Sequence, residues 1–354
     1  MNFPAMALKT LLGGDFSFKF TESEVPFLEP KFYESLPNLR CIRIQRWFSK
    51  GHKDIVEKFL RPLCNQLGIW LVYEIDDVLV YDEVPKFNLA KETFSPAKIG
   101  ESPKEIMQMC DLVTVTTEEL KNLYVHSFSI NPEKIVVIPN FLPRWWIGDA
   151  FSLDKSMKIW EKNKLKPRIA FACSTNHFDV LHKNNGIDDF SALIPWIERN
   201  INRYRFVFVG GCPEQLKKAA QEGKVEVQSP SDILNYPREL MIRNIGLLVA
   251  PLVDIPFNRC KSNIKWLETS ALGIPMIGQN ISTYNKYTNQ VFSKPVDIDK
   301  WIERLFFLRD SKDYVANMLQ KNRKEVEEKW WLESNLIHYY ELYSMQQRMV
   351  EINV

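Results

Sequence analysis

The sequence predicts an α/β protein made of two consecutive doubly wound domains, each with a parallel sheet between helices. The first observation is length, because 354 residues exceed the roughly 100–200 residues of one ordinary domain. The second is the repeated order of a short β-branched run followed by an amphipathic helical stretch, which is typical of βαβ units. The third is a connection near the middle of the chain that contains prolines and a glycine and divides the pattern in two.

The first half of this pattern contains five runs typical of strands. The expected strands are Leu8–Leu12, Cys41–Gln45, Ile69–Ile75, Leu112–Thr116 and Ile135–Ile138. The expected helices between them are His52–Leu67, Pro103–Met109 and Thr117–Phe128. The fourth run is almost entirely apolar or β-branched, as expected for a strand that helices cover on both faces.

The second half repeats the pattern and ends in helices. Residues 139–148 contain two prolines and a glycine, so we place a domain boundary there. The expected domains are residues 1–145 and 146–330, followed by a terminal helical segment at 331–354. The expected strands are Arg168–Cys173, Arg205–Val209, Val225–Gln228, Ile245–Pro251 and Pro275–Gly278. The expected helices are Leu153–Lys162, Asp188–Asn200, Pro213–Gln221, Arg238–Arg243, Lys261–Leu272, Asp297–Leu308, Lys312–Trp330 and Leu332–Met349.

The bulk composition narrows the classes of function. A net charge of +2 with interleaved signs lacks the strongly basic character of an obligate nucleic-acid binder, although it leaves room for a local basic groove. The six cysteines are scattered without a C-x-x-C pair, which favours a reducing compartment and no structural zinc. The N-terminus lacks the order of a signal peptide, and no apolar run approaches the ~20 residues that span a bilayer. We therefore expect a soluble, cytoplasmic protein.

The most informative stretch runs from residue 245 to residue 275. A buried strand leads through a proline-containing loop into a helix, where Lys261, Lys265 and Glu268 are expected to share one face. The start of such a helix lies at the carboxyl end of a parallel strand, where its amides and dipole favour a diphosphate. Glu268 could accept hydrogen bonds from ribose hydroxyls. The alternative is a solvated stripe in which Lys265 and Glu268 form an ordinary i,i+3 pair.

This stretch resembles the donor-binding signature of family-4-type GT-B glycosyltransferases. The variant reads roughly P-L-x-D…F-N…K-S-x-x-K-x-x-E-x-x-A-x-G-x-P. The matching residues are Pro251, Leu252, Asp254, Phe257, Asn258, Lys261, Ser262, Lys265, Glu268, Ala271, Gly273 and Pro275. The resemblance implies that Glu268 binds the donor ribose and that the preceding loop, with Asn258, Lys261 and Ser262, holds the diphosphate and sugar. Many members have two glutamates in an E-x7-E arrangement, and the first of these positions is Cys260 here.

Three further segments of the C-terminal half fit the same resemblance. Residues 171–179 are similar to the first strand and loop of the family's C-terminal domain, which implies that Ser174, Thr175 and His177 lie at the cleft. A lone histidine after a strand is more often structural than catalytic. Gly210 ends the next strand, where a glycine lets backbone approach a nucleotide, although a turn explains it almost as well. Tyr236 lies where such enzymes often contact the nucleobase.

The N-terminal half offers candidate acceptor-side residues. Residues 72–77 resemble the D-x-D-D-like strand end of this glycosyltransferase variant, and Arg46 closes a strand ending in Q-R. Asp76 could act as a general base or orient the acceptor hydroxyl, whereas strand alternation would turn Asp77 to the opposite face. Alternatively, both aspartates cap the following loop. Glu74-x-Asp76 mimics a metal-binding D-x-D, but the resemblance already supplies a metal-free diphosphate site, so no metal is expected.

The resemblance implies a GT-B fold, with two Rossmann-like domains facing a cleft and C-terminal helices that cross back to the N-terminal lobe. It implies a metal-independent hexosyl- or pentosyltransferase with no tightly bound cofactor. The co-substrate would be a nucleotide sugar, with a UDP-sugar favoured. Asp76 and His177 are the catalytic candidates. With retention of anomeric configuration Asp76 would only position the acceptor, and with inversion it would be the base.

The acceptor is left with two alternatives, a glycan or a hydroxymethylated base in phage DNA. Short members of this variant occur in bacteriophages, in which case the protein would act in the host cytoplasm. Features compatible with DNA are Trp145, which could stack on an extruded base, and a basic stretch. The basic residues are Lys158, Lys162, Lys164, Lys166 and Arg168. Other readings are a non-catalytic GT-B protein that binds a nucleotide or a partner, and a nucleotide-sugar epimerase.

Overall fold

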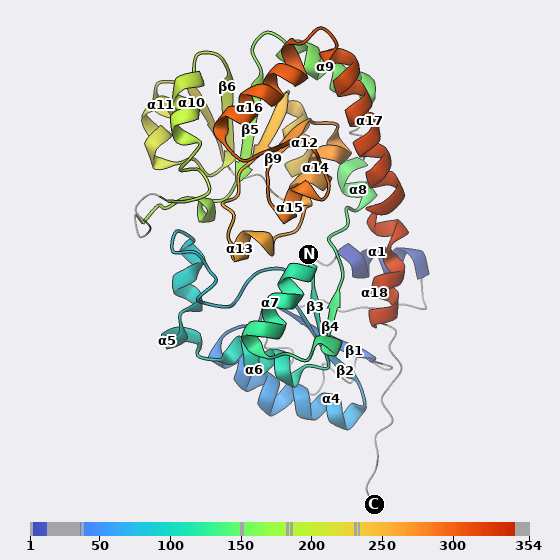
Figure 1. Ribbon diagram of the computed structural model, residues 1–354. Coiled ribbons are helices and arrows are strands. Elements are labelled where there is room, and N and C mark those ends of the chain that lie inside the picture. The colour runs from blue at the N-terminus through green and yellow to red at the C-terminus, as the bar shows by residue number, and fades with distance from the viewer. Residues whose placement is uncertain are drawn as a thin grey trace, which may run out of the picture.

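The chain folds into two lobes, each built on one parallel sheet (Figure 1). This is a computed structural model, and it describes residues 3–12, 36, 39–148, 152–181, 184, 187–229, 232 and 234–343. The lower lobe in the figure holds strands β1 to β4, and the upper lobe holds β5 to β10. We call them the N-lobe and the C-lobe.

The N-lobe sheet has four described strands in the order β1-β2-β3-β4. Their bounds are β1 Cys41–Gln45, β2 Trp70–Glu74, β3 Leu112–Val115 and β4 Ile135–Val137. The elements between the strands are α3 Lys50–Ile55, η3 Val56–Leu60, α4 Arg61–Leu67, η4 Leu89–Phe94, α5 Pro96–Ile99, α6 Ser102–Met109, α7 Glu118–Phe128 and η5 Pro132–Lys134. Spatial order and chain order are the same, so this sheet has no point at which the direction of winding reverses.

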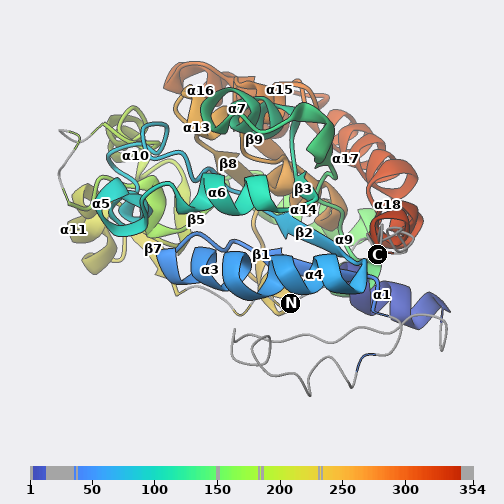
Figure 2. The same ribbon diagram turned by 90° about the horizontal axis from the view of Figure 1, so that it is seen from below.

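Helices cover both faces of the N-lobe sheet. Side chains such as Ile44 and Tyr73 point to the face where η3, α4, α6 and α7 pack, which Figure 2 shows from below. Val72 points the other way and packs against Leu342 of α18 (Leu336–Tyr343). Alternate burial on two covered faces explains why β3 is almost entirely apolar or β-branched, as the sequence predicts for this strand.

The C-lobe sheet has six strands in the order β10-β9-β8-β5-β6-β7. Their bounds are β5 Arg168–Cys173, β6 Arg205–Gly210, β7 Val225–Gln228, β8 Leu247–Ala250, β9 Met276–Gln279 and β10 Val291–Phe292. The chain winds outward from β5 to β7 and then returns to the other side of β5 with β8. The winding direction therefore reverses between β5 and β8, and ligands of such sheets bind beyond the carboxyl ends of the strands at this point.

Two layers of helices enclose the C-lobe sheet. Phe171 and Phe208 face a cluster with α10, α16 and α17, while Ala170 and Val207 face α12 and α14. The elements of this half are α8 Arg144–Ile147, α9 Leu153–Asn163, η7 Thr175–His177, α10 Ile194–Asn200, η8 Glu214–Leu216, α11 Lys217–Gln221, α12 Tyr236–Ile242, α13 Pro256–Arg259, α14 Ile264–Leu272, α15 Ser282–Asn285, α16 Pro295–Ile302, η9 Glu303–Phe307, α17 Ser311–Lys329 and η10 Leu332–Ser334. The predicted α/β fold class with two parallel sheets is confirmed, and among the described strands the reversal of a doubly wound sheet is present in the C-lobe but not in the N-lobe.

The C-terminal helices cross from the C-lobe back to the N-lobe. Helix α17 runs down one side of the molecule and α18 continues beside the N-lobe sheet (Figure 1). Trp331 joins them, and its neighbours exchange backbone hydrogen bonds with Leu142 at 2.9 Å each. This confirms the predicted return of the chain. The expected boundary at residue 145 falls inside α8, and residues 344–354 of the last expected helix lie outside the described residues.

Three predictions about elements were wrong. Leu8–Leu12 belongs to a helix, α1 (Phe3–Leu12), which packs against α18 rather than pairing with the sheet. The helix expected from Lys261 begins only at Ile264, because residues 260–263 form a turn. Lys261 therefore precedes the helix. Of the three residues expected on one helical face, only Lys265 and Glu268 belong to α14. In addition, α10 starts six residues after the expected Asp188, at Ile194.

Gly210 ends β6 at a place with no room for a side chain. Its φ is +102°, and a Cβ there would meet the carbonyl oxygen of Cys173 at 2.4 Å. The next residue, Gly211, donates a backbone hydrogen bond to the same oxygen at 2.7 Å. The end of β6 is thus pressed against the loop that follows β5, which fixes the position of η7.

We predict that Gly210→Ala lowers the free energy of unfolding more than Gly223→Ala does. Both glycines have positive φ, but a Cβ at Gly223 would meet nothing within 4 Å. Backbone strain should cost about 1–2 kcal/mol in each variant, and the contact with Cys173 should add about 1–3 kcal/mol in the first. Urea denaturation measures both, and equal losses would contradict the crowding at Gly210.

Candidate functional site

Two loops meet where the C-lobe sheet reverses its winding. Strand β5 ends at Cys173 and leads into η7, which begins after Ser174. Strand β8 ends at Ala250 and leads through residues 251–255 into α13. Because β5 and β8 are parallel neighbours, their carboxyl ends bring these loops together at one edge of the sheet. Most of the predicted donor residues lie on these loops, on the turn that follows α13 or on α14, whereas Gly210 ends β6 and Tyr236 begins α12.

A buried carboxylate joins the two loops. The side chain of Asp189 is 1% exposed, and its Oδ2 lies 2.7 Å from His177 Nδ1 of the β5 loop. Its Oδ1 accepts a hydrogen bond at 2.7 Å from the backbone N–H of Val253 and one at 2.8 Å from Asn258 Nδ2, both on the β8 side. Burying a carboxylate is costly unless several donors satisfy it, so these contacts hold the loops in one arrangement.

The charges beside this carboxylate affect His177 and Lys261. Burial lowers the pKa of Lys261, while the carboxylates of Asp189 and Asp77 act in the opposite direction. Burial and the positive charge of Lys261 lower the pKa of His177, and the hydrogen bond to Asp189 offsets only part of this. His177 is therefore a neutral imidazole at pH 7. His177 contacts Asp189, and Lys261 lies within the electrostatic reach of both residues.

A second polar cluster lies on α14 and α12. Lys265 Nζ donates a hydrogen bond at 3.3 Å to Tyr236 Oη and lies 3.7 Å from Glu268 Oε2. Glu268 is only 6% exposed, and burial raises the pKa of its carboxyl, with Lys265 and Tyr236 offsetting part of the effect. Burial lowers the pKa of Lys265, but Glu268 and Tyr236 outweigh it and the pKa is raised. Glu268 is buried and the Lys265 side chain is only 28% exposed, so the solvated-stripe alternative does not describe the pair.

The other predicted C-lobe residues have structural partners. Asn258 is fully buried, with its amide nitrogen bonded to Asp189 and to the Val253 carbonyl. Ser262 Oγ accepts a hydrogen bond at 2.8 Å from Asn140 Nδ2 of the connection between the lobes. Ser174 and Thr175 are exposed: Ser174 occupies the N-cap position of η7 without a side-chain capping hydrogen bond, and η7 runs from Thr175 to His177.

Cys260 faces the N-lobe. Its side chain joins the N-lobe core together with Phe257, and its carbonyl accepts a hydrogen bond at 2.9 Å from Thr117 Oγ1. Burial raises the pKa of the Cys260 thiol to about 12, so the side chain is neutral. A glutamate at this position would bury its charge in an apolar core. The apolar surroundings therefore suit the cysteine that stands at this position.

The N-lobe candidates lie at the ends of β1 and β2. Arg46 has φ of +54° and donates from Nε to Asp76 Oδ1 at 2.7 Å. Asp76 and Asp77 follow the end of β2, so the expected strand alternation does not apply to them. Burial raises the pKa of Asp77, whereas the charges of Arg46 and Lys261 lower it. Asp77 is thus within the electrostatic reach of the C-lobe site.

A pocket of about 350 Å³ lies between the lobes. The start of α7 forms its N-lobe wall, and residues around Lys261 and α15 form its C-lobe wall. An ion pair between Lys286 and Glu119 closes one side, with the charged atoms 2.5 Å apart. Lys261 therefore borders an interlobe space as well as the Asp189 cluster.

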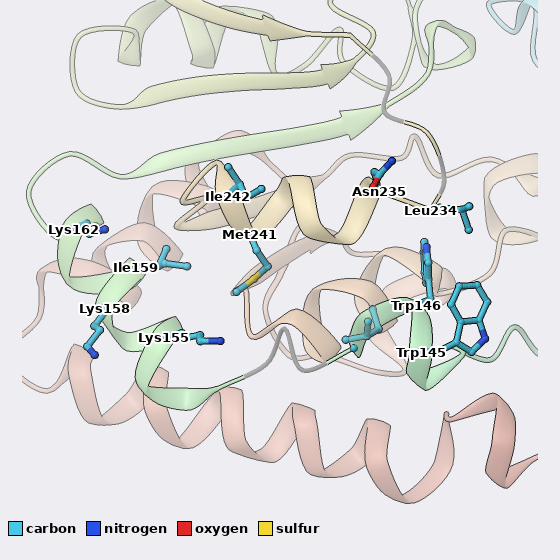
Figure 3. A pocket seen from close by; sticks show the side chains of 12 residues that line it. Trp145, Trp146, Lys155, Lys158, Ile159, Lys162, Leu234, Asn235, Met241 and Ile242 are labelled. Carbon is cyan, nitrogen blue, oxygen red and sulfur yellow. The ribbon is translucent and has the colours of Figure 1, made fainter.

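Trp145 lies elsewhere, in a separate groove of about 620 Å³ on the C-lobe (Figure 3). Its indole is 50% exposed, and Lys155, Lys158 and Lys162 of α9 line the same groove. None of Arg46, Asp76 and Asp77 lines it. The structure therefore brings Trp145 together with part of the basic stretch, but not with the predicted acceptor-side residues.

Asp189 is the residue that the sequence pattern missed. Two aspartates at the start of a predicted helix are usual, since acidic side chains favour that position. The helix begins later, and Asp189 instead turns inward beneath η7. The sequence clue to this contact was a histidine after one strand and an aspartate before the next helix. Many histidine–aspartate pairs with a purely structural role show the same arrangement, so the clue is not specific.

Comparisons with known proteins identify structures with a similar fold. No protein-family model and no curated protein matches the sequence. Among solved structures, a glycosyltransferase from Rickettsia africae is 14% identical, with a TM-score of 0.55 over 98% of this chain and 88% of that one. Anabaena HepE in complex with UDP and glucose is 12% identical, with a TM-score of 0.60 over 96% and 89%.

A third similar structure is an α,α-trehalose-phosphate synthase (UDP-forming) from Burkholderia vietnamiensis. It is 11% identical, with a TM-score of 0.54 over 98% of this chain and 81% of that one. The chain has the GT-B fold. Its described residues contain neither a helix long and apolar enough to cross a membrane nor a group of three acidic, cysteine or histidine side chains suited to a metal.

We predict that His177 makes stability depend on pH below about 6.5, the ordinary pKa of an unfolded histidine. Its folded pKa is lowered, so the unfolded chain binds this proton first as the pH falls. Stability present above pH 6.5 is then lost toward acid, by at most about 1.4 kcal/mol per pH unit. In urea denaturation between pH 7.5 and 5.5, the wild type should lose more stability than His177→Gln. Parallel pH profiles would contradict the lowered pKa.

Proposed function

We propose that the protein is a glycosyltransferase that moves a sugar from a UDP-sugar to a hydroxyl acceptor. The carrying observation is the buried carboxylate of Glu268 on a GT-B fold. Its buried Oε2 has the Lys265 ammonium at 3.7 Å, beyond hydrogen-bond distance, and accepts no hydrogen bond from a described residue. An unsatisfied buried acceptor is costly, and ribose hydroxyls are donors that would relieve the cost. This supports Glu268 as the residue that holds the donor ribose.

In this proposal the donor lies along the edge where β5 and β8 end. Tyr236 lies beside Glu268 and flanks the nucleoside, and Lys261 neutralises the diphosphate next to the η7 loop. Charge that develops on the leaving diphosphate then meets a cation already in place, which lowers the barrier without reorganisation. The loop residues Ser174 and Thr175 belong to the same donor surface, with Asn258 and Ser262 supporting it from below.

The acceptor side of the proposal rests on Asp76. Its ion pair with Arg46 fixes the carboxylate at the end of β2. If the reaction inverts the anomeric centre, Asp76 takes the proton of the acceptor hydroxyl. If the reaction retains the configuration, Asp76 only orients that hydroxyl. No metal has a role in this mechanism, because Lys261 and Lys265 supply the positive charge.

We predict that Glu268→Ala weakens UDP binding about 10- to 100-fold, the effect of losing a hydrogen bond to a charged group. Isothermal titration calorimetry measures the dissociation constant. With UDP-glucose, slow release of UDP should also disappear in this variant. The matched control is Glu328→Ala on the exposed face of α17, where binding should be unchanged.

The same assay separates the proposal from its alternatives. Binding of UDP without turnover of any UDP-sugar would favour a non-catalytic binding protein. A changed sugar on an intact nucleotide would favour an epimerase. If neither UDP nor a UDP-sugar binds, the proposed donor class is wrong.

We propose a glycan hydroxyl as the acceptor, with a hydroxymethylated base in DNA as the second candidate. The observation that favours DNA is the groove of Trp145, whose indole and lysines suit a base and phosphates. That groove lacks the residues at the end of β2, which favours the glycan. We predict no sugar-sized mass gain on hydroxymethylated or plain DNA incubated with a panel of UDP-sugars, read by mass spectrometry of the digested bases. A gain that Trp145→Ala abolishes would establish the DNA acceptor instead.

A further inference from the structure

The hydrogen bonds of Asp189 determine which ring nitrogen of His177 carries the proton. Both carboxylate oxygens are occupied by donors: Val253 and Asn258 on Oδ1, and the imidazole on Oδ2. An ionised carboxylate only accepts hydrogen bonds. The contact of 2.7 Å between Oδ2 and His177 Nδ1 therefore requires the proton to be on Nδ1.

This tautomer leaves a lone pair on the opposite ring nitrogen. His177 is 21% exposed, and no described residue hydrogen-bonds to its Nε2. Burial, together with the positive charge of Lys261, lowers the pKa of the His177 ring and so opposes a second proton on it. The exposed edge of His177 is consequently a hydrogen-bond acceptor held in a fixed direction.

An acceptor such as His177 Nε2 distinguishes the diphosphate of a nucleotide sugar from its sugar. Phosphate oxygens are themselves acceptors, so they cannot form a hydrogen bond with a neutral, unprotonated Nε2. The positive charges of Lys261 and Lys265 are the suitable partners for them. A sugar hydroxyl carries a proton that Nε2 can accept. We propose that Asp189 is a positioning residue that aims the Nε2 lone pair of His177 at a hydroxyl of the donor sugar.

This inference rests on the proposed UDP-sugar donor and assigns its sugar-recognition contact. Asp189 also ties His177 to the β8 loop through Val253, so the acceptor atom keeps its place relative to Lys261. A site built to hydrogen-bond a hydroxyl loses affinity when the partner atom is removed, whereas binding of the nucleotide alone is unaffected.

The test uses the full-length chain and two probes, UDP and UDP-glucose. An asparagine at position 189 offers one acceptor oxygen to three donors, so His177 loses its fixed tautomer. We expect Asp189→Asn to weaken UDP-glucose at least about 10-fold while the dissociation constant for UDP changes less than about 3-fold. The matched control is Asp188→Asn, a neighbour that is equally buried but bonded to the backbone of Asp179 and Phe190. It should leave the ratio of the two dissociation constants unchanged.

Nitrogen NMR of histidine-labelled protein reports which ring nitrogen of His177 is protonated. A purely structural role of Asp189 would not change this tautomer. In the ligand-free wild type, the His177 ring should be protonated at Nδ1 and bare at Nε2, and Asp189→Asn should mix the two tautomers. If that variant fails to fold, His177→Ala removes the same acceptor while leaving Asp189 in place, and it should show the same selective loss of UDP-glucose.

Equal losses for UDP and UDP-glucose in these variants, or a proton on Nε2 in the wild type, would overturn the proposal. If the wild type binds neither probe, the proposed donor and the sugar contact both fail, whereas the tautomer measurement still decides whether Asp189 orients His177. The two failures are therefore distinguishable.

Discussion

The candidate site depends on one buried carboxylate. Asp189 lies beneath the point where β5 and β8 diverge, and it accepts hydrogen bonds from residues that follow each strand. Without such a link, two irregular loops at a sheet edge would each adopt their own arrangement, because loop backbone has no ladder to hold it. The carboxylate makes them one rigid surface, and Gly210 fixes that surface from the neighbouring strand.

The second constraint is the contact between the lobes. Helix α13 starts on the C-lobe but inserts Phe257 and Cys260 into the N-lobe core. This insertion gives position 260 apolar surroundings, which suit the cysteine present there. The same turn brings Lys261 within the fields of Asp189 on one side and Asp77 on the other. Asp189 of the C-lobe and Asp77 of the N-lobe thus both interact with the Lys261 cation.

Much of the fold could be predicted from the sequence, since strands covered on both faces give nearly continuous apolar runs and β5 and β7 have the predicted bounds. The strand predicted at residues 8–12 is wrong because five mostly apolar residues are compatible with a strand or a helix. Packing against α18 stabilises the helix. The start of α14 was placed too early because the turn at residues 260–263 has no proline or glycine to mark it. Lys265 and Glu268 were predictable from helical spacing, whereas Asp189 acquires its role only when two distant loops meet.

The central claim is that the edge of the C-lobe sheet between β5 and β8 holds a UDP-sugar through its nucleoside diphosphate. The most direct measurement is a crystal structure of the protein with UDP. We expect a ribose hydroxyl within hydrogen-bond distance of the Glu268 carboxylate and the diphosphate beside Lys261 and the η7 loop. UDP bound elsewhere, for example in the groove of Trp145, or ribose oriented away from Glu268, would contradict the claim.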